Sequence, residues 1–197
     1  MADKKEPSIQ PANSNYDIVR NELLRWMPRH SVGAEIGTWK GEYAEKMIEV
    51  CQPSHLHLID PYLFSPEYPA RWYGGNIAKS QNDMDRMFHE VRSRLEALAG
   101  EDTKITFHRD LSENALTNLI DDELDWAYID GNHSYEFVKK DLEGLLPKVK
   151  SGGFIMGDDI QWDGVNKAVT EFARNYADQV IVVTIRPHAH QYVFKKL

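Results

Sequence analysis

The sequence has one cysteine, no long apolar run and no leader-like N-terminus, and each of these absences excludes a class of protein. Cys51 stands alone, which excludes an intrachain disulfide framework and a zinc site made of several cysteines. No apolar run approaches the roughly 20 residues that a membrane-spanning helix needs. Residues 1–13 are polar and contain no apolar core of a secretory signal. Together these absences predict a cytoplasmic protein.

Positive charge is also scarce, because 31 acidic residues face 23 basic ones and the net charge is −8. Proteins that bind nucleic acids or anionic membranes use clustered Lys and Arg, so the sequence predicts neither partner. The length of 197 residues fits one large domain. We expect a flexible arm over residues 1–13, which hold two prolines, and a single domain over residues 14–197.

Short apolar runs alternate with helical patterns along this domain. The patterns predict helices at 14–27, 41–51, 84–98, 112–120, 134–149 and 163–177, and strands at 31–37, 55–60, 104–108, 124–130, 152–157, 179–185 and 190–196. Strands that alternate with helices are parallel, whereas the last two strands are too close for a helical crossover. The predicted fold is therefore α/β, a doubly wound, seven-stranded, mostly parallel sheet with an antiparallel C-terminal strand.

Acidic residues lie at or just beyond the ends of these predicted strands. They are Glu35, Asp60, Asp110, Asp130, Asp158 and Asp159. In open α/β sheets, ligands bind outside the carboxyl ends of the strands. We therefore expect these carboxylates to line one crevice.

The first strand-to-helix turn argues against a dinucleotide in that crevice. The turn reads Glu35-Ile36-Gly37-Thr38-Trp39-Lys40-Gly41, and Trp39 occupies the place where a dinucleotide-binding turn has its middle glycine. A bulky indole disfavours close approach of a pyrophosphate. S-adenosylmethionine (SAM) has no phosphate and needs a tight turn, an acid near its ammonium group and an acid for its ribose, so the turn favours SAM.

The acids and the turn can be assigned to parts of SAM. Glu35 and Gly37 suit the methionine end, and Asp60 after the second strand suits the ribose hydroxyls. Asp110 and Leu111 after the third strand could contact adenine. The predicted cofactor-binding set is Glu35, Gly37, Thr38, Trp39, Gly41, Asp60, Asp110, Leu111 and Asp130.

Several longer stretches carry a family resemblance. They are AEIGTWKGEYA, HLIDPY, FHRDLSE, GVNKAVTEF and DWAYIDGNHSYEFVKKDLEGLLPKVKSGGFIMGDDI, within about residues 32–172. In these stretches the chain resembles class I SAM-dependent methyltransferases, and most of all the small family that includes macrolide-sugar and cephalosporin-pathway O-methyltransferases. The resemblance implies the sheet predicted above and SAM as cofactor, and several family members bind a divalent metal. Many relatives have His-Asp-Tyr where this chain has Asp158-Asp159-Ile160, and the Asp-Asp pair keeps oxygen ligands for a metal. The chain lacks the long extra segments with which some antibiotic-pathway members enclose their substrate, so the substrate does not carry over.

The acids after the fourth and fifth strands predict a metal site and a catalytic base. Asp130, Asp158 and Asp159 could converge on one cation, because adjacent strands lie about 5 Å apart, and oxygen ligands suit Mg²⁺ or another divalent ion. His133 follows Asp130 on the same loop and is predicted to accept a proton from a substrate hydroxyl. Asp130 and His133 are the predicted catalytic residues, and the substrate is a small hydroxylated molecule.

Other interpretations of these residues remain open. The acids could cap helices, His133 could be structural, and the aromatic loop 61–76, with Trp72, could be a substrate lid, an apolar plug or a subunit contact in a homo-oligomer. His55 and His57 share one strand face, where packing is the favoured role. The chain could also be a catalytically silent SAM-binding or scaffold protein, or a nicotinamide-dependent oxidoreductase, although Trp39 argues against the last.

Overall fold

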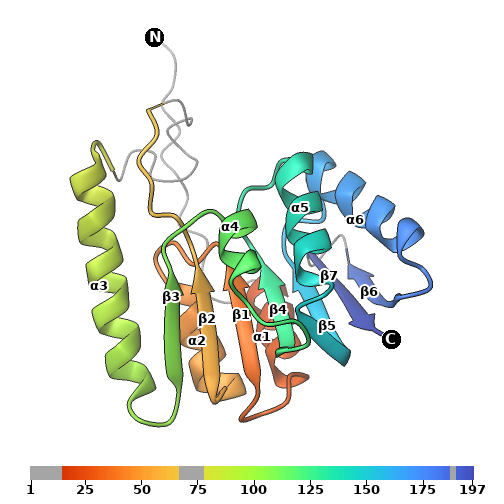
Figure 1. The fold of residues 1–197 in the computed structure, drawn as a ribbon, viewed down its shortest axis with the longest axis horizontal. Coiled ribbons are helices and arrows are strands. Elements are labelled where there is room, and N and C mark those ends of the chain that lie inside the picture. Colours follow the sequence, from red (N-terminus) through yellow and green to blue (C-terminus); the bar gives the residue numbers. More distant parts are fainter. Residues whose placement is uncertain (1–14, 67–77, 187–189) are drawn as a thin grey trace.

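A seven-stranded sheet forms the centre of the computed structural model, which describes residues 15–66, 78–186 and 190–197. The strand order is β3-β2-β1-β4-β5-β7-β6 (Figure 1). The strands are β1 (Val32–Ile36), β2 (His55–Ile59), β3 (Lys104–His108), β4 (Leu124–Ile129), β5 (Val149–Gly157), β6 (Val180–Arg186) and β7 (Gln191–Lys196). Only β7 runs antiparallel to its neighbours, β5 and β6, among the described strands. The predicted doubly wound sheet is confirmed.

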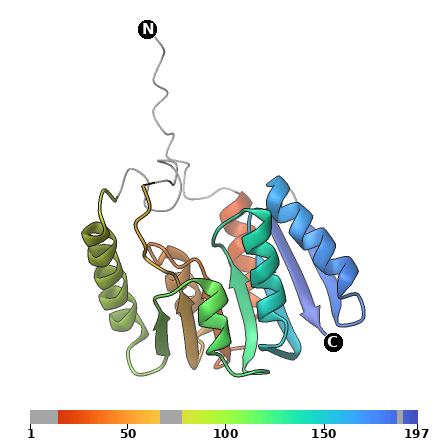
Figure 2. The ribbon, with the colours of Figure 1, turned by 45° about the horizontal axis from the view of Figure 1, so that its top comes forward.

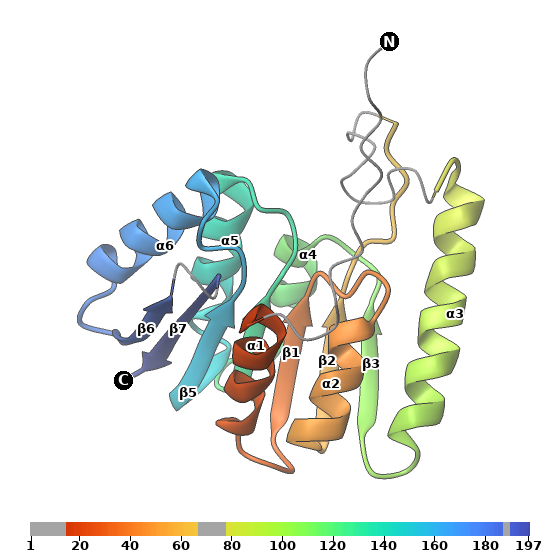
Figure 3. The same ribbon diagram turned by 180° about the vertical axis from the view of Figure 1, so that it is seen from behind.

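Helices cover both faces of the sheet. They are α1 (Asn15–Arg25), α2 (Glu42–Cys51), α3 (Gln81–Ala99), α4 (Ser112–Thr117), α5 (Tyr135–Leu145) and α6 (Asp163–Asn175). Helices α4, α5 and α6 lie on one face (Figure 1), and the view from behind shows α1 and α2 on the other (Figure 3). Helix α3 lies beside β3 at the edge of the sheet. The tilted view in Figure 2 shows both helix layers flanking the sheet.

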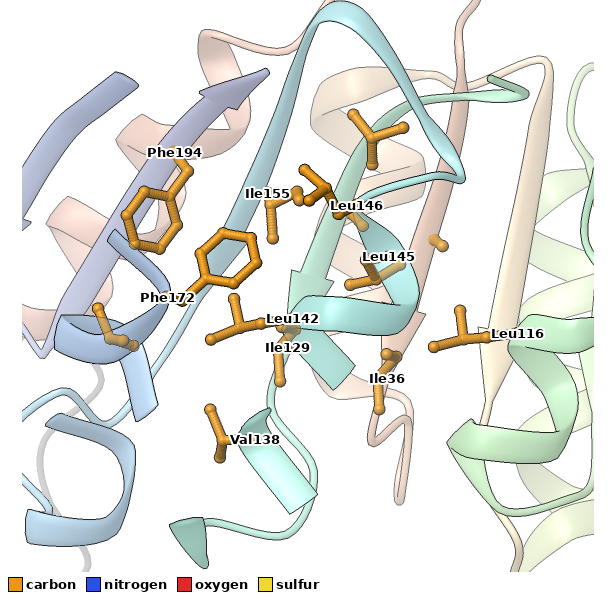
Figure 4. Packing of buried hydrophobic residues seen from close by; sticks show 14 of the residues in the cluster. Ile36, Leu116, Ile129, Val138, Leu142, Leu145, Leu146, Ile155, Phe172 and Phe194 are labelled. Atoms are coloured by element: carbon orange, nitrogen blue, oxygen red, sulfur yellow. The ribbon is translucent and has the colours of Figure 1, made fainter. Parts of the chain in front are cut away.

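The core on the α5 face is a continuous set of aliphatic and aromatic side chains (Figure 4). Leu142 and Leu145 share the inner side of α5 and meet Ile129 and Ile155 of the sheet, with Phe172 of α6 beside them. Each such side chain stabilises the fold by about 1.5–3 kcal/mol when fully buried. A second cluster, which includes Trp126 and Tyr128, fills the α1–α2 face. Because both faces are packed, the strand ends are the natural place for a ligand.

Some element ends differ from the prediction. Helix α5 ends at Leu145 rather than 149. Leu146 still has helical angles, but Pro147 after it has no backbone N–H to continue the helical hydrogen bonds. Strand β5 begins at Val149 instead of 152, so the polar and glycine residues 150–153 belong to the strand. Helix α4 is also shorter than predicted and ends at Thr117.

Two predicted segments fall largely outside the described residues. The arm over residues 1–13 and most of the aromatic loop, including Trp72, cannot be compared with the structure. Among the described helices, none combines the length and the apolar character that crossing a membrane requires.

Candidate active site

A cavity of about 700 Å³ opens beside the carboxyl ends of β1, β2 and β4. Its size is within the range of about 300–1,000 Å³ usual for small-molecule and cofactor sites. Nine of the residues predicted from the sequence line it: Glu35, Gly37, Thr38, Trp39, Gly41, Asp60, Leu111, Asp130 and His133. Asp110, Asp158 and Asp159 are not among the lining residues.

Gly37 lets the first turn lie against the loop after β4. Its φ is +93°, and a Cβ built on it would meet the backbone oxygen of Asp130 at 2.1 Å. The backbone cannot shift as the end of a side chain can, so only glycine fits here. The Gly37 N–H donates to the oxygen of Ile59 at 2.8 Å, which ties the turn to β2 as well.

Asp60 joins the turns after β1 and β2. Its Oδ2 accepts from the backbone N–H of Trp39 at 2.8 Å, and its Oδ1 accepts from the N–H of Tyr62 at 2.9 Å. The Tyr62 hydroxyl donates to the Trp39 oxygen at 2.6 Å. Both carboxylate oxygens of Asp60 are thus fixed by backbone donors of the two turns.

Glu35 presents a buried carboxyl group to the same cavity. The side chain is only 1% exposed, and its Oε2 has no hydrogen-bond partner among the described residues. Burial, helped by the negative charge of Asp130, raises the pKa of Glu35 to about 8, although Arg20 opposes this. A buried acceptor without a partner is costly, and a cationic ligand would relieve that cost.

Two further polar groups lie in the cavity wall. Thr38 Oγ1 and Asp141 Oδ1 are buried without a hydrogen-bond partner among the described residues. Burial raises the pKa of Asp141 to about 7. The sequence interpretation missed Asp141. The available signal was an acid on the apolar side of α5, between Val138 and Leu142.

The two residues predicted to contact adenine have different surroundings. Leu111 lines the cavity and is 37% exposed. Asp110 is exposed and its Oδ1 accepts from Leu111 N at 2.7 Å and from Asn114 Nδ2 at 2.9 Å. Asp110 thus binds the start of α4, and its contact with adenine stays a prediction.

His133 lies between two carboxylates. Its Nε2 is 3.1 Å from Asp159 Oδ2 and 3.5 Å from Asp130 Oδ1. Burial alone would lower the pKa of His133, but the nearby carboxylates of Asp130 and Asp159 outweigh burial and raise it. The structure thereby places a titratable nitrogen close to two carboxylates at the cavity wall, although Nε2 has no hydrogen-bond partner among the described residues.

Arg20 of α1 reaches this acidic group, which the sequence did not indicate. Its guanidinium pairs with Asp130 and lies 3.5 Å from Asp158 Oδ2. The same group stacks 3.8 Å from the centre of the Tyr43 ring. Arg20 therefore offsets part of the repulsion between the carboxylates.

The predicted metal ligands are only partly grouped. Asp130, His133 and Asp159 each offer one donor atom, and these three atoms lie within 4.8 Å of one another. Asp158 is buried; its Oδ1 accepts from Gln191 Nε2 and from Asp159 N, both at 2.7 Å. The donor set fits a divalent cation, and the imidazole favours Mn²⁺ or Zn²⁺ over Mg²⁺.

Solved structures with the same fold include several of methyltransferases. The O-methyltransferase NovP is 19% identical, with a TM-score of 0.61 over 94% of this chain and 84% of its own. SMU.1697c of Streptococcus mutans, assigned as a methyltransferase and solved with SAH, is 10% identical, with a TM-score of 0.63 over 94% and 99%. A protein of Clostridium thermocellum assigned as an rRNA methylase is 14% identical, with a TM-score of 0.65 over 95% and 100%. At such identities the likeness shows the fold.

Sequence comparison gives the family. No curated protein matches the chain. A family model described as a methyltransferase domain matches residues 34–160, which is more than half of the chain and includes the glycine turn, Asp60, Asp130 and His133. The fold and the turn with Trp39, which favours a cofactor without phosphate, agree with this match. The chain belongs to the methyltransferase domain family.

Proposed function

We propose that this protein transfers a methyl group from SAM to a hydroxyl group of a small molecule. The observation that carries the proposal is the position of His133, which lies between Asp130 and Asp159 at the wall of the cavity that holds Glu35 and Asp60. A hydroxyl acceptor needs a base to remove its proton, and histidine suits this role near neutral pH. An amine or a thiol acceptor would depend less on such a base.

The cavity wall suits SAM along its length. When bound, SAM supplies a methyl group on a positively charged sulfur. Glu35 would hold the cationic methionine end, Asp60 would accept from the ribose hydroxyls, and Gly37 would allow close approach of the turn. Asp141, rather than Asp110, offers the buried acceptor near Leu111 and would bind the adenine amino group.

Removal of charge from Asp60 is expected to weaken SAM binding. Asp60→Asn should lower affinity by about 1–3 kcal/mol, because a charge-assisted acceptor is lost and the amide nitrogen faces a backbone N–H. The matched control is Asp110→Asn, which makes the same change on the exposed carboxylate at α4. Calorimetric titration with SAM measures both, and equal affinities would remove Asp60 from the site.

SAM affinity is expected to rise with pH. Because the pKa of Glu35 is raised to about 8, the free protein keeps this proton at pH 7, whereas a cationic ligand favours the carboxylate. Binding therefore releases a proton below pH 8, so affinity should increase from pH 6 to pH 8 and then level off. Calorimetry in buffers of different ionisation enthalpy measures the number of protons released when SAM binds. Glu35→Gln should abolish the release, and an unchanged proton count in this variant would contradict the assignment.

A divalent cation held by the carboxylates of Asp130 and Asp159 would orient the acceptor oxygens and help a hydroxyl to ionise, with His133 left to accept the proton. If it is needed, EDTA should abolish turnover, and Mn²⁺ or Mg²⁺ should restore it. Asp159→Asn should raise the metal concentration required, since it keeps an oxygen but loses a charge. Full activity in EDTA would show that the two acids serve only to hold His133 in place.

The alternative is a SAM-binding protein without turnover. The position of His133 between two acids at the cavity wall favours the enzyme, because a protein that only binds SAM would not need this arrangement. The net charge of −8 favours a small-molecule acceptor over a nucleic acid. A screen of hydroxylated compounds that follows SAM consumption separates the two functions. We further propose a cytoplasmic location and assembly into a homo-oligomer.

A further inference from the structure

We propose that the sheet surface at β2 carries a binding site for a transition-metal ion such as Zn²⁺, made by His55, His57 and Glu123. This site lies outside the cavity and does not depend on methyl transfer. One donor atom from each residue lies within 4.8 Å of the other two.

Strand geometry explains how the three residues meet. His55 and His57 alternate along β2 and so point to the same face, with ring centres 4.0 Å apart. Glu123 directly precedes β4, and its Oε1 lies 3.6 Å from His57 Nε2. The apolar core of this face includes only Ile59 from β2. His55 and His57 therefore lie beside the apolar cluster of this face and are not part of it.

His57 has the burial and the ring contacts of a metal ligand. Its side chain is 5% exposed, and Nε2 has no hydrogen-bond partner among the described residues. Its other ring nitrogen, Nδ1, is 2.9 Å from Nε2 of His108, and the two rings stack with centres 5.1 Å apart. A histidine that binds a metal through one nitrogen commonly has the other fixed by a second group. His108 would thus be a positioning residue for His57.

Distances and charge are compatible with Zn²⁺. Ligands at about 2.0–2.2 Å in a tetrahedral site lie roughly 3.3 Å apart, close to the 3.6 Å between His57 and Glu123. His55 and Glu123 are partly exposed, so they can move the remaining distance and leave a position for water. Burial lowers the pKa of His57 to about 3, and burial and Lys104 lower that of His55, so both rings are neutral as ligands must be. Lys104 opposes a cation here, and the Glu123 carboxylate offsets it.

The test is a Co²⁺ titration of the full chain, followed by the visible absorption of tetrahedral Co²⁺ and by displacement with Zn²⁺. The Asp159→Ala variant, which removes one donor from the cluster at the cavity, serves as background. We expect one ion per chain. His55→Ala and Glu123→Gln should each weaken binding at least about 10-fold, and His108→Asn about 10–100-fold.

Controls separate this site from general effects. His89→Ala and Glu101→Gln change exposed residues of the same types elsewhere and should leave Co²⁺ affinity unchanged. Zn²⁺ should raise the melting temperature of the background protein but not of its Glu123→Gln variant. SAM affinity should be the same in all these variants, so failure here says nothing against the proposed enzyme. Absence of stoichiometric binding, or a Co²⁺ affinity in His55→Ala and Glu123→Gln equal to that of the background protein, would overturn the proposal.

Discussion

Turnover should fall about 10²–10⁴-fold when His133 is replaced by alanine, the usual contribution of a general acid–base group. The variant loses the nitrogen that lies between Asp130 and Asp159 at the cavity wall. SAM binding should stay near normal, because Glu35 and Asp60 are untouched. The effect therefore belongs to kcat and not to cofactor affinity.

The pH profile makes this test specific. The loss should shrink as pH rises, because more of the acceptor hydroxyl is then ionised without help. In the parent protein, activity should increase with pH through the raised pKa of His133, since only the neutral ring accepts a proton. His89→Ala changes an exposed histidine on α3 and is the matched control. Full activity of His133→Ala at pH 7 would exclude the histidine as base.

Gly37→Ala should destabilise the protein by about 2–5 kcal/mol and abolish measurable SAM binding. A left-handed conformation costs an L-residue about 1–2 kcal/mol, and overpacking adds about 1–3 kcal/mol. The added methyl group would meet the Asp130 backbone oxygen at 2.1 Å, so the turn and the loop after β4 must separate. Both carry residues of the cavity wall.

Gly152→Ala isolates the conformational part of that cost. Gly152 also has a positive φ, +84°, but nothing lies within 4 Å of a Cβ built there. In this control the free energy of unfolding should fall by only about 1–2 kcal/mol, and SAM should bind normally. Chemical denaturation and calorimetry measure the two quantities. If both alanine variants behave alike, the contact between the two loops has no energetic importance.

The alternating pattern was enough to predict the sheet, because parallel strands with crossover helices allow few arrangements. The same pattern placed Glu35, Asp60 and Asp130 at strand ends, and all three line the cavity. Residues on helices were harder to find. Arg20 is an ordinary charged residue in the sequence, and only the packing of α1 beside Tyr43 brings it to Asp130.

Local competition for hydrogen bonds was also invisible in the sequence. Asp110 and Asp158 follow strands just as Asp130 does, yet Asp110 binds the start of α4 and Asp158 accepts from Gln191 of β7. Gln191 lies 33 positions away in the sequence, so no local pattern announces the pair. His55 and His57 were correctly placed on one face, but the approach of His108 and Glu123 depends on strand register and on the turn before β4.

Calorimetric titration with SAM, compared with SAH and NAD⁺, shows whether the cavity holds the cofactor. SAM and SAH should bind one per chain and compete with each other. Asp60→Asn should weaken the binding of both, Asp110→Asn should not, and NAD⁺ should not bind. Absence of SAM binding to the folded protein, or SAM affinity that is the same in both variants, would contradict the assignment of this cavity as the cofactor site.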